Sequence, residues 1–599
     1  MPTPLRLVLL SCLMLFVELA LIRWTGSNVV YLSYFSNFVL LGSFLGIGIG
    51  FLRGKARVNL FPYAPVALTA LIGLVLIFPV RIDRSGSDLI YFGHFGTSGL
   101  PVWVTLPFIF LAVAGVMALI AEGVARTFVE LEPLEAYRWD IAGSILGIVA
   151  FSVLSFMWAP PVAWGVVTAV LFAVVMRPRM RLLQTVALIG LVLILGRESI
   201  LPVWSWSPYY KITTVASEEP GGAVFVDANG VPHQSAVAVD VRREENPEYF
   251  IPYERTEIEN LDNVLIIGAG TGTDVAIALA EGAEHIDAVE IDPKLLQIGV
   301  DRHPDQPYAD PRVSAHVNDG RAFLEQTDQQ YDLILFALPD SLTLVSGQSS
   351  LRLESYLFTI EAMESARDHL APGGAFAMYN FYRETWLVDR LAGTLQTVYG
   401  QTPCLDTVGE AGKLAVLSVA PDPATVSCPS GSAWSVTDSA AAASPATDNY
   451  PFLYLRTPSI PDIYLVTLLL ILVASVGMVR VVSGPLRPMR GYLDLFFMGV
   501  AFLLLETKSV VQFALLFGTT WFVNALVFAG VLASVLAAIE VARRWQPANH
   551  AWLYGALLFA IAVAWIIPVE YFLSLDALPR FVFAVLVWFT PIFIANLVF

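Results

Sequence analysis

The sequence predicts a multi-pass α-helical membrane bundle with an inserted, water-soluble α/β domain. The first observation is composition: 56% of the 599 residues are hydrophobic and only 14% are charged, whereas a soluble domain carries about 25% charged residues. The second is charge distribution. Between Glu198 and Ser459 there are 36 Asp and Glu against 14 Lys and Arg, while the rest holds 15 acidic and 20 basic residues. An acidic soluble region therefore separates two apolar flanks, and its charge disfavours nucleic acid as a partner.

Both flanks contain apolar segments long enough to cross a bilayer, for which about 20 residues are needed. Seven spans are expected before the acidic region, at residues 5–22, 29–52, 60–80, 101–123, 138–158, 160–176 and 182–197. Five more are expected after it, at residues 462–482, 492–514, 520–542, 550–569 and 578–598. The lipid bilayer is therefore the expected partner of both flanks.

The chain is expected to divide into five regions, which are an N-terminal membrane domain (1–198), a small β subdomain (199–262), an α/β domain (263–420), a flexible connector (421–460) and a C-terminal membrane domain (461–599). The connector is rich in Pro, Ser and Ala, which is typical of flexible linkers. In the α/β domain, strand-like runs alternate with helical stretches, which predicts a doubly wound parallel sheet. The runs are 264–267, 286–291, 313–317, 333–336, 375–379 and 414–419.

Basic residues are grouped in alternate loops between the expected spans. They are Arg53, Lys55, Arg57, Arg126, Arg138, Arg177, Arg179, Arg181, Arg480, Arg487, Arg490, Arg543 and Arg544. Loops rich in Lys and Arg remain in the cytoplasm, so both halves of the chain predict that the acidic domain lies outside it. On that side Cys404 and Cys428 could form a disulfide.

A glycine-rich turn follows the first strand of the α/β domain. Gly268, Ala269, Gly270, Gly272 and Asp274 lie between this strand and a helix. Glycines let the backbone approach a ligand closely, and the helix start offers free N–H groups. The pattern predicts a ligand site, although glycines that serve only helix–sheet packing are the alternative.

Two carboxylates follow the next two strands. Glu290 lies 22 residues after Gly268, and Asp319 precedes Gly320 at the tip of the third strand. A carboxylate about 20 residues past the first glycine is placed to bind a ribose diol, and Asp319 could accept a hydrogen bond from an adenine amino group. An adenine nucleoside is therefore the expected ligand.

These motifs, together with Asp310-Pro311-Arg312, Tyr331-Asp332 and Pro372-Gly373-Gly374, resemble the spermidine synthase (aminopropyltransferase) family within the Rossmann-like class I methyltransferase fold. The likeness covers about residues 207–420, and the β-rich start resembles the small N-terminal β domain of that family. Fusion to membrane helices resembles a group of bacterial membrane-bound spermidine-synthase-like proteins, which implies the bacterial cytoplasmic membrane as the location.

The resemblance implies decarboxylated S-adenosylmethionine as co-substrate, with Glu290 on the ribose and Asp319 on the adenine. It also implies an acidic loop after the fourth strand that deprotonates the attacking amine. Here Ala337 stands where the first Asp of that loop is expected. Asp340 remains as the catalytic candidate, with a helix N-cap as its alternative role.

Two further positions depart from the family pattern, because Phe358 replaces a Tyr and Tyr210 replaces a Gln. His233 and Gln234 lie either at the mouth of the site or in a surface loop. Tyr249 and Tyr253 are expected to pack rather than to bind substrate.

Three functions remain open at this point. The first is transfer of an aminopropyl group to a small-molecule amine or a membrane-associated acceptor. The second is methyl transfer from S-adenosylmethionine, and the third is a non-catalytic nucleoside- or polyamine-binding domain on a transporter or sensor. No metal site is expected, and a homo-oligomer is compatible with the sequence. Because such co-substrates are made in the cytoplasm, their supply favours a cytoplasmic domain, against the basic loops.

Charged residues also lie within the expected spans. Glu18 lies in the first, and Glu506 and Lys508 lie in the ninth. A charge at this depth is costly and is usually paired. We expect Glu18 to pair with Lys508 or Arg23, with a polar cavity for a substrate or a cation as the alternative.

Overall fold

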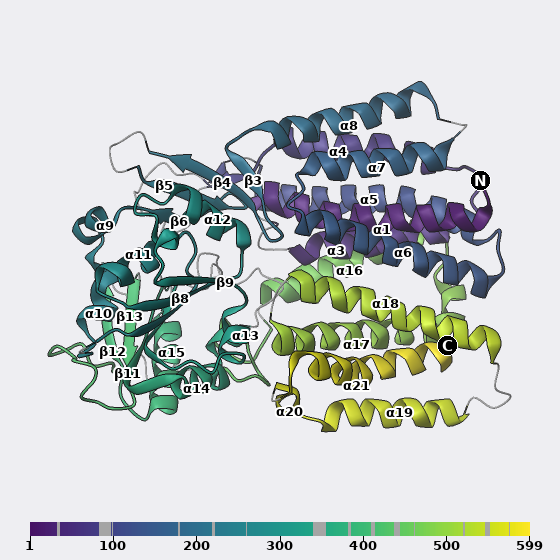
Figure 1. The fold of residues 1–599 in the computed structure, drawn as a ribbon. Helices are drawn as coiled ribbons and strands as arrows, with labels where there is room; N and C mark the ends of the chain where they lie inside the picture. Colours follow the sequence, from purple (N-terminus) through teal and green to yellow (C-terminus); the bar gives the residue numbers. More distant parts are fainter. Residues whose placement is uncertain are drawn as a thin grey trace. The chain divides into compact units, whose positions relative to one another are not determined.

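The computed structural model describes residues 1–30, 32, 36–82, 97–98, 100–177, 180–217, 222–258, 260–338, 355–380, 382, 385–408, 414–435, 444–460, 462–518, 521–545, 551–573 and 575–598 (Figure 1). The chain forms two compact units. The helical unit comprises Met1–Val80, Gly99–Leu201 and Pro461–Phe599, and the α/β unit comprises Arg81–Ser98 and Pro202–Ile460. In the α/β unit, β1 (Arg81–Ile82) pairs with β2 (Thr97–Ser98).

A helix lies at each of the twelve expected spans. The N-terminal group is α1 (Thr3–Asn28), α3 (Ser36–Leu52), α4 (Ala64–Ile77), α5 (Val102–Phe128), α6 (Pro133–Phe156), α7 (Pro161–Met176) and α8 (Leu182–Ile200). The C-terminal group is α16 (Asp462–Ser483), α17 (Leu493–Phe517), α18 (Trp521–Arg544), α19 (Ala551–Ile566) and α21 (Ala577–Val598), with the short α20 (Glu570–Leu573) before the last. Within the described residues, eight helices are long and apolar enough to cross a membrane, and four apolar helices are shorter.

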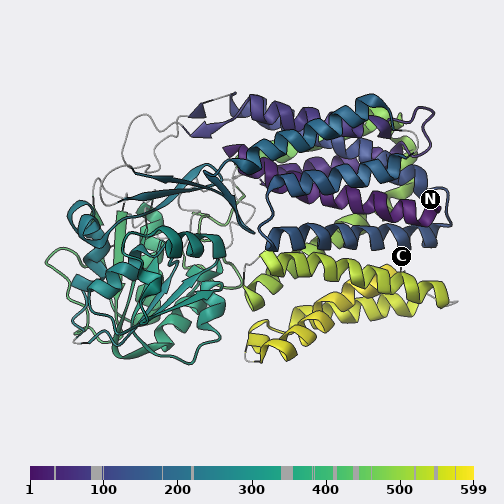
Figure 2. The ribbon, with the colours of Figure 1, turned by 45° about the horizontal axis from the view of Figure 1, so that its top comes forward.

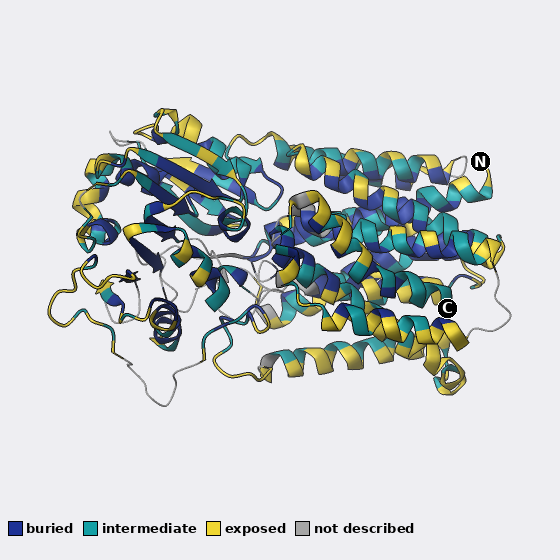
Figure 3. Cartoon of the chain, turned by 60° about the horizontal axis from the view of Figure 1, so that its bottom comes forward, coloured by how far each residue is buried: buried dark blue, intermediate teal, exposed yellow. Residues whose placement is uncertain are grey.

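Large apolar side chains lie on the surface of the helical unit. In α16, Leu470 is 64% exposed and Val473 is 62% exposed, and exposed residues follow the helices in Figure 3. Water disfavours contiguous apolar surface of this kind, which is typical of a protein or membrane contact.

The two halves of the helical unit meet between α6 and α18, where Arg138 and Glu540 form an ion pair. The expected pairs of Glu18 are not formed. Its Oε1 atom is buried and has no hydrogen-bond partner among the described residues, while Arg23 donates to Ser155 Oγ at 2.7 Å and Lys508 lies 3.5 Å from the Ala564 carbonyl. Residues five apart point to different faces of a helix, which explains why Glu18 and Arg23 do not meet.

From Pro202 onward, the α/β unit first forms a four-stranded antiparallel sheet, visible in Figure 2. Its strands are β3 (Trp204–Trp206), β4 (Lys211–Ala216), β5 (Val224–Ala228) and β6 (Val231–Ala236). The turn between the last two uses Asn229 and Gly230, both at positive φ, which suits the tight connection of a hairpin. Then follow α9 (Val239–Glu245), η2 (Pro247–Phe250) and α10 (Ile251–Glu254).

The main sheet has seven strands in the order β12-β13-β11-β10-β7-β8-β9. They are β7 (Asn263–Ile267), β8 (His285–Glu290), β9 (Val313–Val317), β10 (Tyr331–Ala337), β11 (Leu370–Asn380), β12 (Cys404–Val408) and β13 (Leu414–Val419). The first five in sequence pair in parallel in the Rossmann-like order.

The expectation of a wholly parallel sheet is wrong at one edge. Strand β13 runs antiparallel to both of its neighbours, β11 and β12. Only five residues separate β12 from β13, whereas a parallel connection needs a dozen or more. Strand β12 itself was not expected, so the sheet is mixed.

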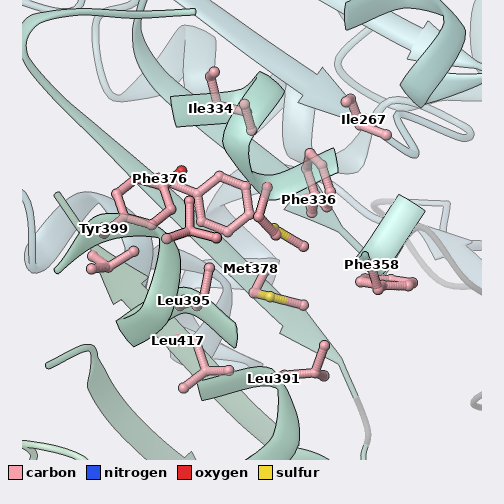
Figure 4. Packing of buried hydrophobic residues seen from close by; sticks show 14 of the residues in the cluster. Ile267, Ile334, Phe336, Phe358, Phe376, Met378, Leu391, Leu395, Tyr399 and Leu417 are labelled. Atoms are coloured by element: carbon pink, nitrogen blue, oxygen red, sulfur yellow. The ribbon is translucent and has the colours of Figure 1, made fainter. Parts of the chain in front are cut away.

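Helices cover both faces of this sheet. They are α11 (Thr273–Ala280), α12 (Pro293–Arg302), α13 (Gly320–Leu324), α14 (Ile360–Asp368) and α15 (Thr385–Tyr399), with η3 (Pro307–Ala309) and η5 (Tyr356–Phe358) between them. Alternate residues of each strand enter opposite cores. Phe336 and Met378 lie in one core, shown in Figure 4, and Ala337 and Tyr379 lie in the other.

The described parts of 421–460 pack on the sheet domain, which differs from the expected flexible connector. Cys404 and Cys428 form a disulfide, and Asp448 makes a buried ion pair with Arg321. Arg390 donates to main-chain carbonyls of Phe452 and Leu453. The amino-acid composition of 421–460 does not predict this packing, because the disulfide, the ion pair and the hydrogen bonds join residues far apart in sequence.

Candidate functional site

The glycine-rich turn leaves the carboxyl end of β7 and leads directly into α11. Gly268, Gly270 and Gly272 have φ values of 86°, 52° and 95°, a region that favours glycine over other residues. The N–H groups of Gly268 and Ala269 donate to the Val289 carbonyl at 3.0 and 3.1 Å. The turn is thereby held against the end of β8.

Glu290, the last residue of β8, lies against this turn. Its Oε2 atom accepts a hydrogen bond from Gly270 N at 2.9 Å, and Oε1 accepts one from Asp292 N at 2.8 Å. Burial raises the pKa of Glu290 to about 7, while these N–H groups act in the opposite direction. Each carboxylate oxygen keeps a further acceptor site, so the group can still receive hydroxyl donors.

Asp319 follows β9 and caps α13, where its Oδ1 atom accepts from the N–H groups of Arg321 and Ala322 at 3.1 Å each. Its neighbour Gly320 packs on the side chain of Ile267, at a position where a Cβ atom would overlap that side chain. Since Asn318 N also donates to the Glu290 carbonyl at 3.1 Å, the ends of β7, β8 and β9 meet. The predicted residues Gly270, Glu290, Asp319 and Gly320 therefore belong to one edge.

Two residues outside the predicted site also hold the turn. Gln234 of β6 accepts hydrogen bonds from Thr271 N and Oγ1 at 2.9 and 3.1 Å, and its amide nitrogen has no partner among the described residues. Tyr308 donates to the Gly270 carbonyl at 2.8 Å. Gln234 thus lies at the turn, whereas no sequence signal pointed to Tyr308.

Asp274 is predicted to bind ligand together with the glycine-rich turn, but its side chain is bonded to β11 instead. Its buried carboxylate accepts a hydrogen bond from the hydroxyl of Tyr379 in β11. Burial raises the pKa of Asp274 to about 6, and the hydrogen bond and the nearby Arg242 act in the opposite direction. The carboxyl is therefore mostly ionised at neutral pH.

The predicted amine side of the edge lies at the ends of β10 and β11. Ala337 ends β10, is 2% exposed and pairs in register with Tyr379. Asp340 lies outside the described residues. Phe358 is buried in the hydrophobic core beside Phe336, at a ring distance of 6.3 Å (Figure 4).

The remaining candidates lie in the small sheet and in the segment that follows it. His233 is in β6 and packs on Tyr210, at a ring distance of 6.2 Å, so it is a strand residue rather than a loop residue. Tyr249 packs on Tyr379 at 5.3 Å, and Tyr253 is buried in the same core. No group of three His, Cys, Asp or Glu suited to a metal ion occurs among the described residues.

Part of the α/β unit is similar to known proteins. Residues 251–402 match the model of the spermine/spermidine synthase domain. This part of the chain is therefore similar to spermidine synthase domains. The matched range contains the glycine-rich turn, Glu290 and Asp319, and it ends just before β12.

Curated relatives of the spermidine synthase-like domain are polyamine aminopropyltransferases. The one from Vibrio vulnificus is 29% identical over 181 residues, which are 28% of this chain and 56% of the relative. The one from Alkaliphilus metalliredigens is 37% identical over 84 residues, covering 14% of this chain and 30% of the relative. The chain thus spans about half or less of the length of these relatives. A solved spermidine synthase from Thermotoga maritima is 15% identical with a TM-score of 0.29, covering 45% of this chain and 87% of that one.

Proposed function

We propose that this chain is a membrane-bound transferase that moves the aminopropyl group of decarboxylated S-adenosylmethionine to an amine. The observation that carries the proposal is the pairing of Glu290 with the N–H of Gly270 at 2.9 Å, beside the capped end of α13. This arrangement suits an adenosine group, with ribose hydroxyls donating to Glu290 and the adenine towards Asp319. The matched domain and the names of the curated relatives support the same chemistry.

The reaction is a direct displacement at a sulfonium carbon. The amine nitrogen forms a bond to the methylene carbon, the carbon–sulfur bond breaks, and its electron pair stays on the thioether that leaves. The protein contributes mainly by holding donor and acceptor in line and by removing a proton from the amine.

Methyl transfer from S-adenosylmethionine is the second candidate function. The observation in its favour is Ala337, since the methyl side chain at the end of β10 supplies no acid–base group for an amine. The two donors differ by a carboxylate, so binding distinguishes them.

The test is calorimetric titration of the full-length protein in detergent with decarboxylated S-adenosylmethionine, S-adenosylmethionine and methylthioadenosine. Preference for the decarboxylated donor supports aminopropyl transfer, and preference for the methyl donor supports the second candidate. No binding of any of the three contradicts both and leaves a non-catalytic domain. Transfer of radiolabel from the preferred donor to the diamine putrescine then tests the amine acceptor.

We also propose that the helical unit lies in the bilayer with the α/β unit outside the cytoplasm. The basic loops and the Cys404–Cys428 disulfide support this side. The donor must then reach that side of the membrane. After treatment of intact cells with an impermeant reductant, an impermeant maleimide should label Cys428, which is exposed, and labelling only after lysis would contradict the placement.

A further inference from the structure

The hydrogen bond between Tyr379 and Asp274 crosses the middle of the sheet edge. Asp274 belongs to the helix after β7, Tyr379 is the penultimate residue of β11, and β10 lies between these two strands. Ala337 is the last residue of β10 and the register partner of Tyr379. Both residues enter the same core, so the bridge passes on the face where Ala337 presents only a methyl group.

The carboxylates of Glu290, Asp319 and Asp274, all described at this edge, have different hydrogen-bond partners. Glu290 receives the N–H groups of Gly270 and Asp292, and Asp319 caps α13. Both belong to the nucleoside side in the proposed function. Among these three described carboxylates, only that of Asp274 is bonded to the side of β10 and β11, through Tyr379, and the amine loop is expected after β10.

We propose that Asp274 is the catalytic base that binds the acceptor ammonium group and removes its proton, with Tyr379 as its positioning residue. The proposal rests on the proposed function, because it names the acid–base group of that same site. It also assigns to Asp274 a role in acceptor chemistry rather than in donor binding.

The surroundings of Asp274 suit an alkylamine. Tyr249 and Tyr379 present rings 5.3 Å apart at an angle of 71°, and Tyr253 joins them in the same core. Aromatic rings bind cations. The Tyr249 ring already holds the Arg242 guanidinium, 4.8 Å from its centroid, which leaves Tyr379 and Tyr253 to cover an alkylamine. The Tyr253 hydroxyl is buried without a hydrogen-bond partner among the described residues. Buried polar groups normally have one, so this hydroxyl indicates a place for a ligand or a water.

The groups near Asp274 leave its carboxylate ionised near neutral pH, so that it can accept a proton. Burial raises its pKa to about 6, below neutral pH, which suits a general base. The facing cation is Arg242 of α9, whose guanidinium is held by Asn246 and by Ser235 at 2.7–3.0 Å. The other facing groups are the neutral phenols of Tyr249, Tyr253, Tyr308 and Tyr379.

The proton and electron balance of the step is closed. The acceptor ammonium gives one proton to the Asp274 carboxylate, and the freed nitrogen lone pair forms the bond to carbon. The carbon–sulfur electron pair stays on sulfur, which loses its positive charge, while the nitrogen of the product becomes a secondary ammonium. Asp274 then releases its proton to water.

The experiment compares Asp274→Asn with Asp287→Asn in the full-length protein. Asp287 is a matched control, since it is a buried Asp of β8 that accepts a tyrosine hydroxyl, that of Tyr331, at 2.9 Å. With the donor and putrescine, Asp274→Asn should lower kcat by about 10²- to 10⁴-fold. Methylthioadenosine affinity should stay at the wild-type value, and Asp287→Asn should leave both quantities unchanged.

The pH profile separates a base from a structural residue. In the wild type, kcat should fall on the acid side with a midpoint near the pKa of Asp274, about 6. Tyr379→Phe removes the hydrogen bond that lowers this pKa, so the midpoint should move to higher pH while the carboxylate remains. Because this variant keeps Asp274, it tests the proposal even if Asp274→Asn fails to fold.

Three results overturn the proposal: equal kcat for Asp274→Asn and Asp287→Asn, loss of methylthioadenosine binding in Asp274→Asn, or an unchanged midpoint in Tyr379→Phe. Failure of the proposed function looks different, since the wild-type protein itself would then prefer S-adenosylmethionine or bind none of the three ligands.

Discussion

The carboxyl edge of the main sheet has two halves, one at the ends of β7, β8 and β9 and one at the ends of β10 and β11. The first half has the residues that the resemblance to spermidine synthases implies, and the second half departs from them. At the ends of β7, β8 and β9, the turn, Glu290 and Asp319 are joined by main-chain hydrogen bonds. At the ends of β10 and β11 the side chains are Ala337 and Tyr379. In the proposed function the first half binds the donor and the second half carries the acceptor chemistry, so variants in one half should change one of these properties and leave the other.

The largest effect is expected from removing the Glu290 carboxylate at the ends of β7, β8 and β9. Glu290→Ala should weaken methylthioadenosine binding by at least about 100-fold, since hydrogen bonds to a charged group contribute about 1.5–3 kcal/mol each. Titration calorimetry measures this, with Asp287→Asn on the same strand as control. Equal affinity of Glu290→Ala and wild type would remove the nucleoside site from this half.

The next effect comes from the turn itself. In Gly270→Ala the new Cβ would overlap the side-chain amide of Gln234, so nucleoside affinity should fall about tenfold or more, equivalent to about 1.4 kcal/mol. Gly282→Ala is the matched control, because Gly282 also has positive φ but has open space around its Cβ position. It should lower stability by about 1–2 kcal/mol without changing the affinity.

A double variant sharpens this prediction. Gln234→Ala provides room for the added methyl group, so nucleoside affinity in the Gly270→Ala, Gln234→Ala protein should exceed that of Gly270→Ala alone. If the double variant binds no better, then backbone strain at residue 270 or loss of the hydrogen bonds from Thr271 to Gln234, rather than overlap, explains the loss.

The pH dependence of binding reports on the same carboxylate. Burial raises the pKa of Glu290 in the free protein to about 7. Hydroxyl donors favour the ionised form, so binding releases a proton below this pH. Affinity should therefore be constant above about pH 7 and fall by up to about tenfold per pH unit below it. The Glu290→Gln protein should show a flat profile when calorimetry is repeated at several pH values.

The difference between the halves also explains what the sequence could predict. The glycine turn, Glu290 and Asp319 follow strands at regular intervals, so a local pattern predicts both the elements and their common edge. The pairing of Asp274 with Tyr379 joins residues 105 positions apart, and nothing local indicates it. Sequence therefore places Asp274 with its neighbours in the turn, whereas packing across β10 places its carboxylate with Tyr379.

The same distinction holds for the fold. Alternation of strands and helices predicts the five parallel strands, because each unit is continuous in sequence. The direction of β13 depends on the hairpin with β12, and the packing of 421–460 depends on distant partners such as Arg390 and Arg321. In the helical unit, the length of an apolar segment predicts the helix, but it does not predict the partner of a charged side chain such as Glu18.

The smallest effect on nucleoside affinity is expected from the substitution Asp448→Asn. Its carboxylate forms a bidentate pair with the guanidinium of Arg321 in α13, at 2.5 and 2.6 Å. Arg321 lies two residues after Asp319, which caps the same helix. Breaking a buried pair costs about 3–5 kcal/mol, so Asp448→Asn should lower the unfolding temperature of the full-length protein measured by intrinsic fluorescence. Asp406→Asn breaks the ion pair with Arg255, which is more exposed than the pair of Asp448 with Arg321, so it should lower the unfolding temperature less.

Nucleoside affinity of Asp448→Asn should nevertheless stay close to the wild-type value. The cap of α13 uses the main-chain N–H groups of Arg321 and Ala322, and these remain when the side-chain pair is lost. A loss of affinity as large as that of Glu290→Ala would mean that the segment leading to α16 controls the nucleoside half. The donor site would then depend on the chain that enters the helical unit, and the two halves of the edge would no longer be separable by local contacts.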